Sequence, residues 1–244
     1  MKIALFADGL VGLHITRFLA DCYPEDVAVV VAISENEIFA LAKDRGLPSH
    51  LYDATHAIPL IISGGVDLGV LAWWPKIIRN PLLEFPTHGF INTHPSLLPH
   101  NRGKHYNFWA LVEQAPFGVT LHRVDKGVDT GDIVAQRQIP YDWTDNGGTL
   151  YAKAQDAMIG LFCDFYSKLR GGDFTSTPQD NSLASFHHSS EIDAASRIDL
   201  DRLYRGREFL NILRARTFAG HPGCWFEDQG DRYEISIKIK KVQS

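Results

Sequence analysis

Short apolar runs recur along the first half of this chain, and none of them alternates with polar residues. A strand with one wet face alternates apolar and polar residues, whereas parallel strands covered on both faces read as unbroken apolar runs. Amphipathic patterns of helical period separate these runs. The alternation predicts an α/β fold with an open, mostly parallel sheet. The predicted strands cover residues 2–7, 27–33, 68–72 and 90–93. One predicted helix follows Gly9 and Gly12 and runs to about Cys22, and another covers 35–45.

The pattern changes after Gly118, where two predicted strands flank a polar loop at 125–132. A long amphipathic helix follows, and the polar stretch after it has little periodicity. This organisation predicts a first domain at 1–172, a linker at 173–190 and a small α+β C-terminal appendage at 191–244. The other predicted elements are strands at 119–124, 133–139, 224–226 and 232–239, and helices at 149–169 and 202–217.

Charge and composition exclude several classes of protein. The formal net charge of -5 provides no overall basic field for nucleic acid, and no run approaches the ~20 apolar residues of a membrane span. Asp8 and Arg17 interrupt the first apolar stretch, and no signal-peptide cleavage pattern follows. Three separated cysteines, Cys22, Cys163 and Cys224, favour reduced and mostly buried thiols over disulfides or structural zinc. We therefore expect a cytoplasmic protein.

The most informative stretch reads INTHPSLLPHNRG and begins at the fourth predicted strand. Asn92 and His94 stand two residues apart, so both side chains should leave the same face of that strand. Pro95 then takes the chain out of regular structure, which places both groups at the carboxyl end, where α/β sheets bind ligands. A carboxamide can donate to a developing oxyanion, and an imidazole can move the proton that an attacking amine loses.

A carboxylate beside the imidazole would orient it and favour its charged form. The loop DKGVDTGD offers Asp125, Asp129 and Asp132 for this task. From residue types alone a structural histidine and ordinary turn aspartates are the more frequent interpretation. The residues by themselves therefore leave the catalytic and structural alternatives open.

The motifs together resemble a known family. N-x-H-x-S-L-L-P-x-x-R-G, G-V-T-L-H and D-T-G-x-I, at this spacing, are similar to the folate-dependent formyltransferases over about residues 2–169. The resemblance implies a Rossmann-like formyltransferase sheet, N10-formyltetrahydrofolate as cosubstrate and no metal. It also implies that Asn92 stabilises the oxyanion, that His94 donates and accepts the proton, and that Asp129 raises the pKa of the histidine.

The resemblance extends to binding residues. Lys104 matches a position that often carries a basic residue near the folate, and the run after it ends in Asn-Phe-Trp, as in the branch that acts on nucleotide-linked amino sugars. Tyr106 departs from the proline common in that branch, so substrate stacking and simple packing both stay open for it. The implied folate-binding residues are Lys76, Ile77, Ile78, Lys104, Asp125, Lys126, Gly127, Val128 and Asp129, and the implied substrate-binding residues are Tyr106, Asn107 and Trp109.

The resemblance favours formylation of the free amine of a dideoxy-amino-hexose type of sugar nucleotide, for surface polysaccharide such as lipopolysaccharide O-antigen. The alternative is a glycinamide ribonucleotide formyltransferase of purine synthesis, although such enzymes usually lack a tail after the long helix. A tRNA formyltransferase would need a basic appendage, whereas residues 175–244 carry ten acidic and ten basic side chains. Pairing through the C-terminal hairpin is common in relatives, which raises the prospect of a homodimer.

Other classes of protein have weaker support. A nucleotide-binding dehydrogenase would need glycine where this chain has Ala7, so only the last two glycines of the fingerprint are present. His94, His100 and His105 match no zinc-binding spacing. A binding module without activity would normally have lost one member of the Asn, His and Asp set, which this chain retains.

Overall fold

The structure is a computed structural model that describes residues 1–53 and 65–242. The chain forms two compact units. The first, here called the sheet unit, comprises Met1–His94, Val119–Arg137 and Gln155–Gln179, and the second, here called the tail unit, comprises Pro95–Gly118, Gln138–Ala154 and Asp180–Ser244.

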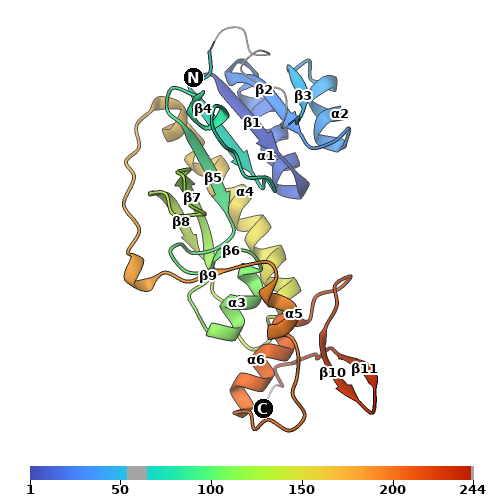
Figure 1. The fold of residues 1–244 in the computed structure, drawn as a ribbon. Coiled ribbons are helices and arrows are strands. Elements are labelled where there is room, and N and C mark those ends of the chain that lie inside the picture. The colour runs from blue at the N-terminus through green and yellow to red at the C-terminus, as the bar shows by residue number, and fades with distance from the viewer. Residues whose placement is uncertain (54–64, 243–244) are drawn as a thin grey trace. The chain divides into compact units, whose positions relative to one another are not determined.

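The sheet unit is built on a seven-stranded sheet in the order β3-β2-β1-β4-β5-β7-β8, counted over the described residues (Figure 1). Its strands are β1 Ile3–Ala7, β2 Val27–Ala32, β3 Ser49–Leu51, β4 Leu68–Ala72, β5 Phe90–His94, β7 Gly118–Arg123 and β8 Ile133–Gln138. Its helical elements are α1 Gly9–Cys22, η1 Pro24–Asp26, α2 Glu37–Asp44, η3 Leu82–Glu84 and most of α4 Gly147–Gly171.

The strand directions confirm the predicted fold class. β1 runs parallel to both β2 and β4, β2 to β3, and β4 to β5. β7 then pairs with β5 in the antiparallel direction, which makes the sheet mixed. In that pairing Asn92 stands opposite His122 and His94 opposite Thr120. The register therefore brings polar residues of two strands to one end of β5.

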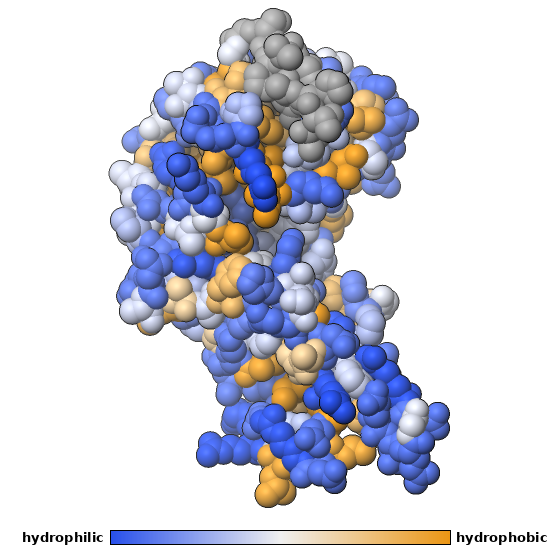
Figure 2. Space-filling model, in the orientation of Figure 1, coloured by the Kyte–Doolittle hydropathy of each residue, from blue (hydrophilic) through white to orange (hydrophobic). Residues whose placement is uncertain are grey.

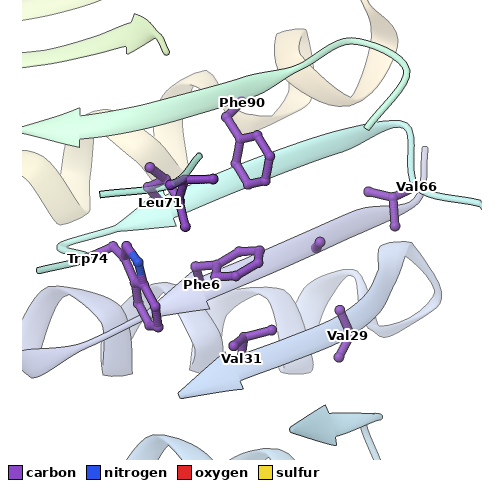
Figure 3. Close-up of a cluster of buried hydrophobic side chains, with 9 residues drawn as sticks. Phe6, Val29, Val31, Val66, Leu71, Trp74 and Phe90 are labelled. Atoms are coloured by element: carbon purple, nitrogen blue, oxygen red, sulfur yellow. The ribbon is translucent and has the colours of Figure 1, made fainter. Parts of the chain in front are cut away.

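A cluster of buried apolar side chains covers one face of the sheet. Figure 3 shows Phe6, Leu71 and Phe90 on neighbouring strands in one cluster with Trp74, and the Phe6 ring meets the rings of both Trp74 and Phe90 edge to face. Gly69 makes room for this packing, because a Cβ atom there would lie 2.2 Å from the Phe90 ring. Full burial of each such side chain stabilises the fold by about 1.5–3 kcal/mol. The rest of the cluster is Ala4, Val29, Val31, Val66 and Ile78.

Helices α1 and α4 pack together through aromatic rings, since Phe18 meets the rings of Phe162 and Tyr166 edge to face. The Tyr166 hydroxyl also donates to buried Asp26 at 2.8 Å, and Arg170 Nε donates to the same carboxylate oxygen at 2.6 Å. Burial opposes ionisation of Asp26, but the hydrogen bonds from Arg170 and Tyr166 outweigh it and hold its pKa below the usual value. This carboxylate therefore fastens α4 to the start of β2.

The tail unit has a small core of its own, in which Ile212 and Leu213 of α6 pack with Ile198 and Cys224. Arg214 donates to the backbone carbonyls of Asp142 and Asp145 and so supplies hydrogen-bond donors to the loop before α4. The elements of the tail unit are β6 Arg102–Gly103, α3 Tyr106–Glu113, η4 Asn181–Leu183, β9 Phe186–His187, α5 Glu191–Ala195, α6 Gly206–Arg216, β10 Cys224–Asp228 and β11 Asp231–Ile235.

Most predicted elements are confirmed within one to three residues at their ends, and the exceptions lie mainly in the tail unit. The predicted helix at 202–217 begins only at Gly206, because Arg205 is extended and serves as its N-cap. The second predicted hairpin strand ends at Ile235 rather than at 239. Helix α3 was not predicted. The stretch 173–190 contains η4 and β9, and the predicted division into a domain, a linker and an appendage stays a prediction.

The surface is mainly polar. Figure 2 shows hydrophilic side chains over most of the visible face, with hydrophobic residues in small separate groups, as on ordinary protein surfaces. Within the described ranges no helix is both long and apolar enough to cross a bilayer. The three cysteines are free thiols, but only Cys224 is buried, so the expectation of mostly buried cysteines is wrong for exposed Cys22 and half-buried Cys163.

Candidate active site

Three polar side chains converge at the carboxyl end of β5. The Asp129 carboxylate lies 3.4 Å from His94 Nδ1 through one oxygen, and its other oxygen accepts from Asn92 Nδ2 at 3.5 Å. Asn92 and His94 therefore share one face of the strand, as their spacing predicts. The side chains of His94 and Asp129 are only 5% and 13% exposed, so water screens their interaction weakly.

The loop between β7 and β8 presents Asp129 in an uncommon backbone conformation, with φ at 54°. Asp125 shapes the same loop by accepting from the Gly127 amide at 3.0 Å and from the Thr130 hydroxyl at 2.7 Å. Asp132 accepts from the Ser176 hydroxyl at 3.3 Å. Of the three carboxylates that the sequence offers, Asp129 is thus the one that meets His94.

His122 is a fourth member of the cluster, and sequence reasoning did not single it out. Its Nε2 atom lies 3.2 Å from Asn92 Nδ2 and 3.6 Å from the Asp129 carboxylate. Its Nδ1 atom lies 2.8 Å from the Arg123 carbonyl, which can only accept, so Nδ1–H donates there and Nε2 faces the Asn92 amide. The sequence signal for His122 was that it ends the motif GVTLH, which lies on β7, the strand paired with β5.

Thr93, on the opposite face of β5, links this strand to the loop after β4. Its hydroxyl donates to the Leu71 carbonyl at 3.0 Å and accepts from the Trp73 amide at 2.8 Å. Trp73 takes a left-handed backbone with φ at 58°, which directs the chain into the segment that begins at Lys76. The strand that carries Asn92 and His94 therefore holds the chain at Trp73, three residues before the predicted folate-binding segment.

The two segments expected to bind folate differ in exposure. Lys76 and Ile77 are exposed, the latter by 67%, while Ile78 is buried in the apolar cluster of the sheet. Asp125 and Val128 lie in the exposed part of the other loop, and Val128 is 46% exposed. Lys126 and Gly127 are exposed as well. Each segment thus offers backbone and one exposed apolar side chain, and their contact with folate stays a prediction.

The residues expected to bind the second substrate belong to the tail unit. Tyr106 is buried and stacks between Phe117 and Tyr151, and burial raises the pKa of its hydroxyl well above the usual value. Asn107 Nδ2 donates to the Gly147 carbonyl at 2.8 Å. Trp109 stacks on the His187 ring at 3.9 Å. Lys104 is exposed. The structure shows how these side chains pack, and their substrate contacts stay predictions.

Among residues 1–53 and 65–242, no group of three or more His, Cys, Asp and Glu side chains is arranged to hold a metal ion. The cluster of His94, His122 and Asp129 is likewise not arranged to hold a metal ion. Their arrangement instead suits proton transfer and hydrogen bonding to a polar substrate atom.

Two family models match this chain. The formyl transferase model matches residues 27–164, more than half of the 244 residues, and therefore includes the whole cluster at β5. The model for the N-formyltransferase dimerization C-terminal domain matches residues 191–241.

Curated relatives match about three fifths of the chain. A methionyl-tRNA formyltransferase of Listeria monocytogenes is 38% identical over 155 residues, which are 63% of this chain and 49% of the relative. A dTDP-4-amino-4,6-dideoxyglucose formyltransferase of Mycobacterium bovis is 29% identical over 149 residues, which are 61% of this chain and 63% of the relative. The match thus spans between about half and just under two thirds of these relatives.

Solved structures share the fold over nearly the whole chain. A 4-N formyltransferase from Francisella tularensis has a TM-score of 0.80 and 23% identity, and the match covers 99% of this chain and 98% of that one. An N-formyltransferase from Helicobacter canadensis, solved with folinic acid and dTDP-3-aminofucose, has a TM-score of 0.71 and 17% identity, with 89% and 81% covered. The formyl transferase model, which matches more than half of the residues, shows that the chain belongs to the formyl transferase family.

Proposed function

We propose that this enzyme transfers the formyl group of N10-formyltetrahydrofolate to the free amine of a nucleotide-linked amino sugar. The observation that carries the proposal is the convergence of Asn92, His94 and Asp129 at the end of β5. A carboxamide, an imidazole and a carboxylate around one point supply what acyl transfer to an amine requires: stabilisation of an oxyanion and transfer of a proton.

The proposed reaction begins when the unprotonated amine attacks the formyl carbon. A carbon–nitrogen bond forms, and negative charge collects on the formyl oxygen. Asn92 Nδ2 turns the N–H of its long, 3.5 Å contact with Asp129 to the formyl oxygen and stabilises this charge together with protonated His94, while the Asp129 carboxylate favours the protonated imidazole. The bond to the folate nitrogen then breaks, and that nitrogen receives the proton released by the amine, through His94 or a water molecule.

His122 orients the amide in this scheme. Because its Nδ1–H donates to the Arg123 carbonyl, its Nε2 atom accepts from Asn92 Nδ2. This contact holds one N–H of the amide and fixes its orientation, and the other N–H, which makes the long contact with Asp129, is the one that serves the reacting group. His122 therefore acts on the reaction by holding Asn92 in place rather than by exchanging a proton with substrate.

The folate is proposed to lie against the backbone of residues 76–78 and 125–129, with Lys104 near its acidic end. The exposed side chains of Ile77 and Val128 offer apolar surface to an aromatic ring system. The proposal is supported by the Helicobacter canadensis neighbour, whose structure contains folinic acid. No metal takes part in it.

A sugar nucleotide is the proposed acceptor for three reasons. A relative with this activity is 29% identical, the C-terminal model belongs to N-formyltransferases, and the Helicobacter canadensis neighbour was solved with dTDP-3-aminofucose. The segment that begins with Tyr106, Asn107 and Trp109 is proposed to contact this substrate. The product would enter surface polysaccharide, for example lipopolysaccharide O-antigen. The reaction is proposed to occur in the cytoplasm, in a homodimer formed through residues 191–241.

Formylation of methionyl-tRNA is the second candidate, because the Listeria relative is more similar in sequence, at 38% identity. An enzyme that grips tRNA must neutralise several phosphates. Residues 175–244 carry ten acidic and ten basic side chains and therefore offer no net positive charge for binding phosphates. We therefore rank this candidate below the sugar nucleotide.

The test incubates the full-length protein with N10-formyltetrahydrofolate and separate acceptors, and mass spectrometry detects the added formyl group. The acceptors are dTDP- and UDP-linked 3- and 4-amino sugars, methionyl-tRNA and glycinamide ribonucleotide. We expect formylation of at least one amino sugar and unchanged activity with a chelator. Formylation of methionyl-tRNA or glycinamide ribonucleotide alone would contradict the sugar proposal. Absence of transfer to every acceptor would contradict formyl transfer itself.

A further inference from the structure

The segment that follows α4 runs beside the Asp129 loop. Thr177 and Ile133 exchange two backbone hydrogen bonds of 2.8 Å, which form an isolated antiparallel bridge. The Ser176 hydroxyl lies 3.3 Å from both Arg123 Nε and the Asp132 carboxylate. These contacts, all within the sheet unit, bring the next residues of the segment against the turn that carries Asp129.

Gln179 then reaches into that turn. Its Nε2 atom donates to the backbone carbonyl of Asp129 at 2.9 Å and to that of Gly131 at 2.7 Å. A primary amide has two N–H hydrogens, so both are used on carbonyls on either side of Thr130. Gln179 is only 9% exposed, and water therefore competes weakly for these bonds.

The turn needs such a support for two reasons. Asp129 has φ at 54°, a left-handed conformation that residues other than glycine seldom adopt. At Gly131 a Cβ atom would lie 1.8 Å from the Arg123 carbonyl oxygen, so the turn also passes very close to the end of β7. Asp125 supports the exposed side through Gly127 and Thr130, while Gln179 supports the buried side.

We propose that Gln179 is a positioning residue for formyl transfer: its amide holds the Asp129 turn so that the carboxylate stays within reach of His94 and His122. This inference rests on the proposed function, because it assigns Gln179 an effect on a carboxylate whose role is itself proposed. If Gln179 merely stabilised the fold, its substitution would lower stability, and the effect on kcat would not depend on Asp129.

The first experiment is a double-mutant cycle on the full-length protein, with N10-formyltetrahydrofolate and dTDP-4-amino-4,6-dideoxyglucose as substrates. Gln179→Met keeps the length of the side chain but removes both donors. Because small displacements of a catalytic group can cost up to ~10²-fold in rate, we expect kcat to fall about 10–100-fold while KM for the sugar changes little. In an Asp129→Asn background the same substitution should cause almost no further loss.

Gln155→Met, on α4, is the matched control and should leave kcat unchanged. If Gln179→Met does not fold, Gln179→Asn retains the amide but withdraws it by one methylene, and the same selective link to Asp129 is expected. An unchanged kcat in the Gln179 variants, or an equal fold-loss with and without Asp129, would overturn the inference. A normal rate in Asp129→Asn alone would instead overturn the proposed function.

A second readout does not depend on turnover. The ring signals of His94 in NMR spectra titrate with pH, and a nearby carboxylate favours the protonated ring. We expect the midpoint pH of this titration to fall in both Asp129→Asn and Gln179→Met, and to stay unchanged in Gln155→Met. A midpoint that falls in Asp129→Asn but not in Gln179→Met would contradict the proposed role of Gln179.

Discussion

The polar residues at the end of β5 and those at the start of α3 are bonded in different ways. Around Asn92, His94 and Asp129 the contacts are 3.4–3.5 Å long and run among the candidate catalytic groups. In the tail unit, Asn107 is bound at 2.8 Å to a backbone carbonyl, and Tyr106 is enclosed by aromatic rings. The first group joins candidate catalytic side chains to one another, while the second joins side chains to the backbone and to aromatic rings.

This difference distinguishes side chains proposed to act in the reaction from side chains that stabilise the fold. Long contacts at a catalytic cluster commonly shorten only when substrate is bound, so their length in the free enzyme does not argue against a role. Short contacts to backbone carbonyls, by contrast, stabilise the fold directly, and their loss leaves a buried acceptor without its donor. Substitutions in the two regions should therefore differ in whether they change turnover or stability.

The largest expected effect belongs to the cluster at β5. Asn92→Ala, His94→Ala and Asp129→Ala should each reduce kcat by at least ~10²–10³-fold, the usual cost of losing an oxyanion donor. Steady-state formyl transfer measures the effect, and circular dichroism with thermal melting checks that the fold persists. Near-normal turnover in any one of the three would withdraw the role given to that residue.

Loss of the Asn107 amide should act mainly on stability. Asn107→Ala removes the donor to the Gly147 carbonyl and should lower the free energy of unfolding by about 1–3 kcal/mol, as measured by urea titration. If the segment also contacts the sugar nucleotide, KM rises severalfold while kcat changes little. A loss of stability with KM unchanged would withdraw the substrate contact, and a large fall in kcat would break the distinction between the two regions.

A second buried carboxylate provides a sharper comparison with Asp129. Asp26 accepts from Arg170 and Tyr166, and these bonds hold its pKa below the usual value. Its contribution to the free energy of unfolding is therefore fully present above the unfolded-state pKa of about 3.9. Asp26→Asn should lower unfolding stability at pH 7 by about 1–3 kcal/mol and leave kcat unchanged. The stability difference from wild type should shrink as pH falls below about 4.

Urea titrations of both proteins between pH 3 and pH 7 measure this dependence. A stability difference that grows toward acid would contradict the assignment, because a carboxylate with a depressed pKa loses its advantage on protonation. A fall in kcat comparable to that of Asp129→Ala would show that the two carboxylates do not have separate roles.

The smallest effect concerns the thiols. Burial raises the pKa of Cys163 to about 11 and that of Cys224 to about 12, so both stay protonated at pH 8. Exposed Cys22 should therefore react first with a thiol reagent in the native protein, with one equivalent modified before any unfolding. Loss of this fast phase in Cys22→Ser checks the assignment. Fast modification of Cys224 would contradict its burial.

The sequence predicted most strands and helices of the sheet unit but fewer elements of the tail unit. Unbroken apolar runs identify the parallel strands because both faces are buried, and the spacing of Asn92 and His94 places them on one face. Helix α3 was missed, since it starts from a left-handed His105, a feature without a periodic signal. The late start of α6 reflects the extended backbone of Arg205, which likewise has no simple sequence signature.

The same limit applies within the candidate site. His122 joins the cluster only because β7 pairs antiparallel with β5 and sets it opposite Asn92, which no local pattern specifies. Gln179 reaches Asp129 from 50 residues away in the sequence, through a single bridge between Thr177 and Ile133. Local periodicity does not encode such contacts, because they depend on which distant segments become neighbours in the fold.

The most direct test of the central claim compares formyl transfer by His94→Ala, Asp129→Asn and the double variant. Groups that act as one unit lose most of their effect when either is removed, so the double variant should be hardly slower than the slower single variant. Rate losses that multiply, or a double variant with nearly wild-type turnover, would show that the imidazole and the carboxylate at the end of β5 do not work together.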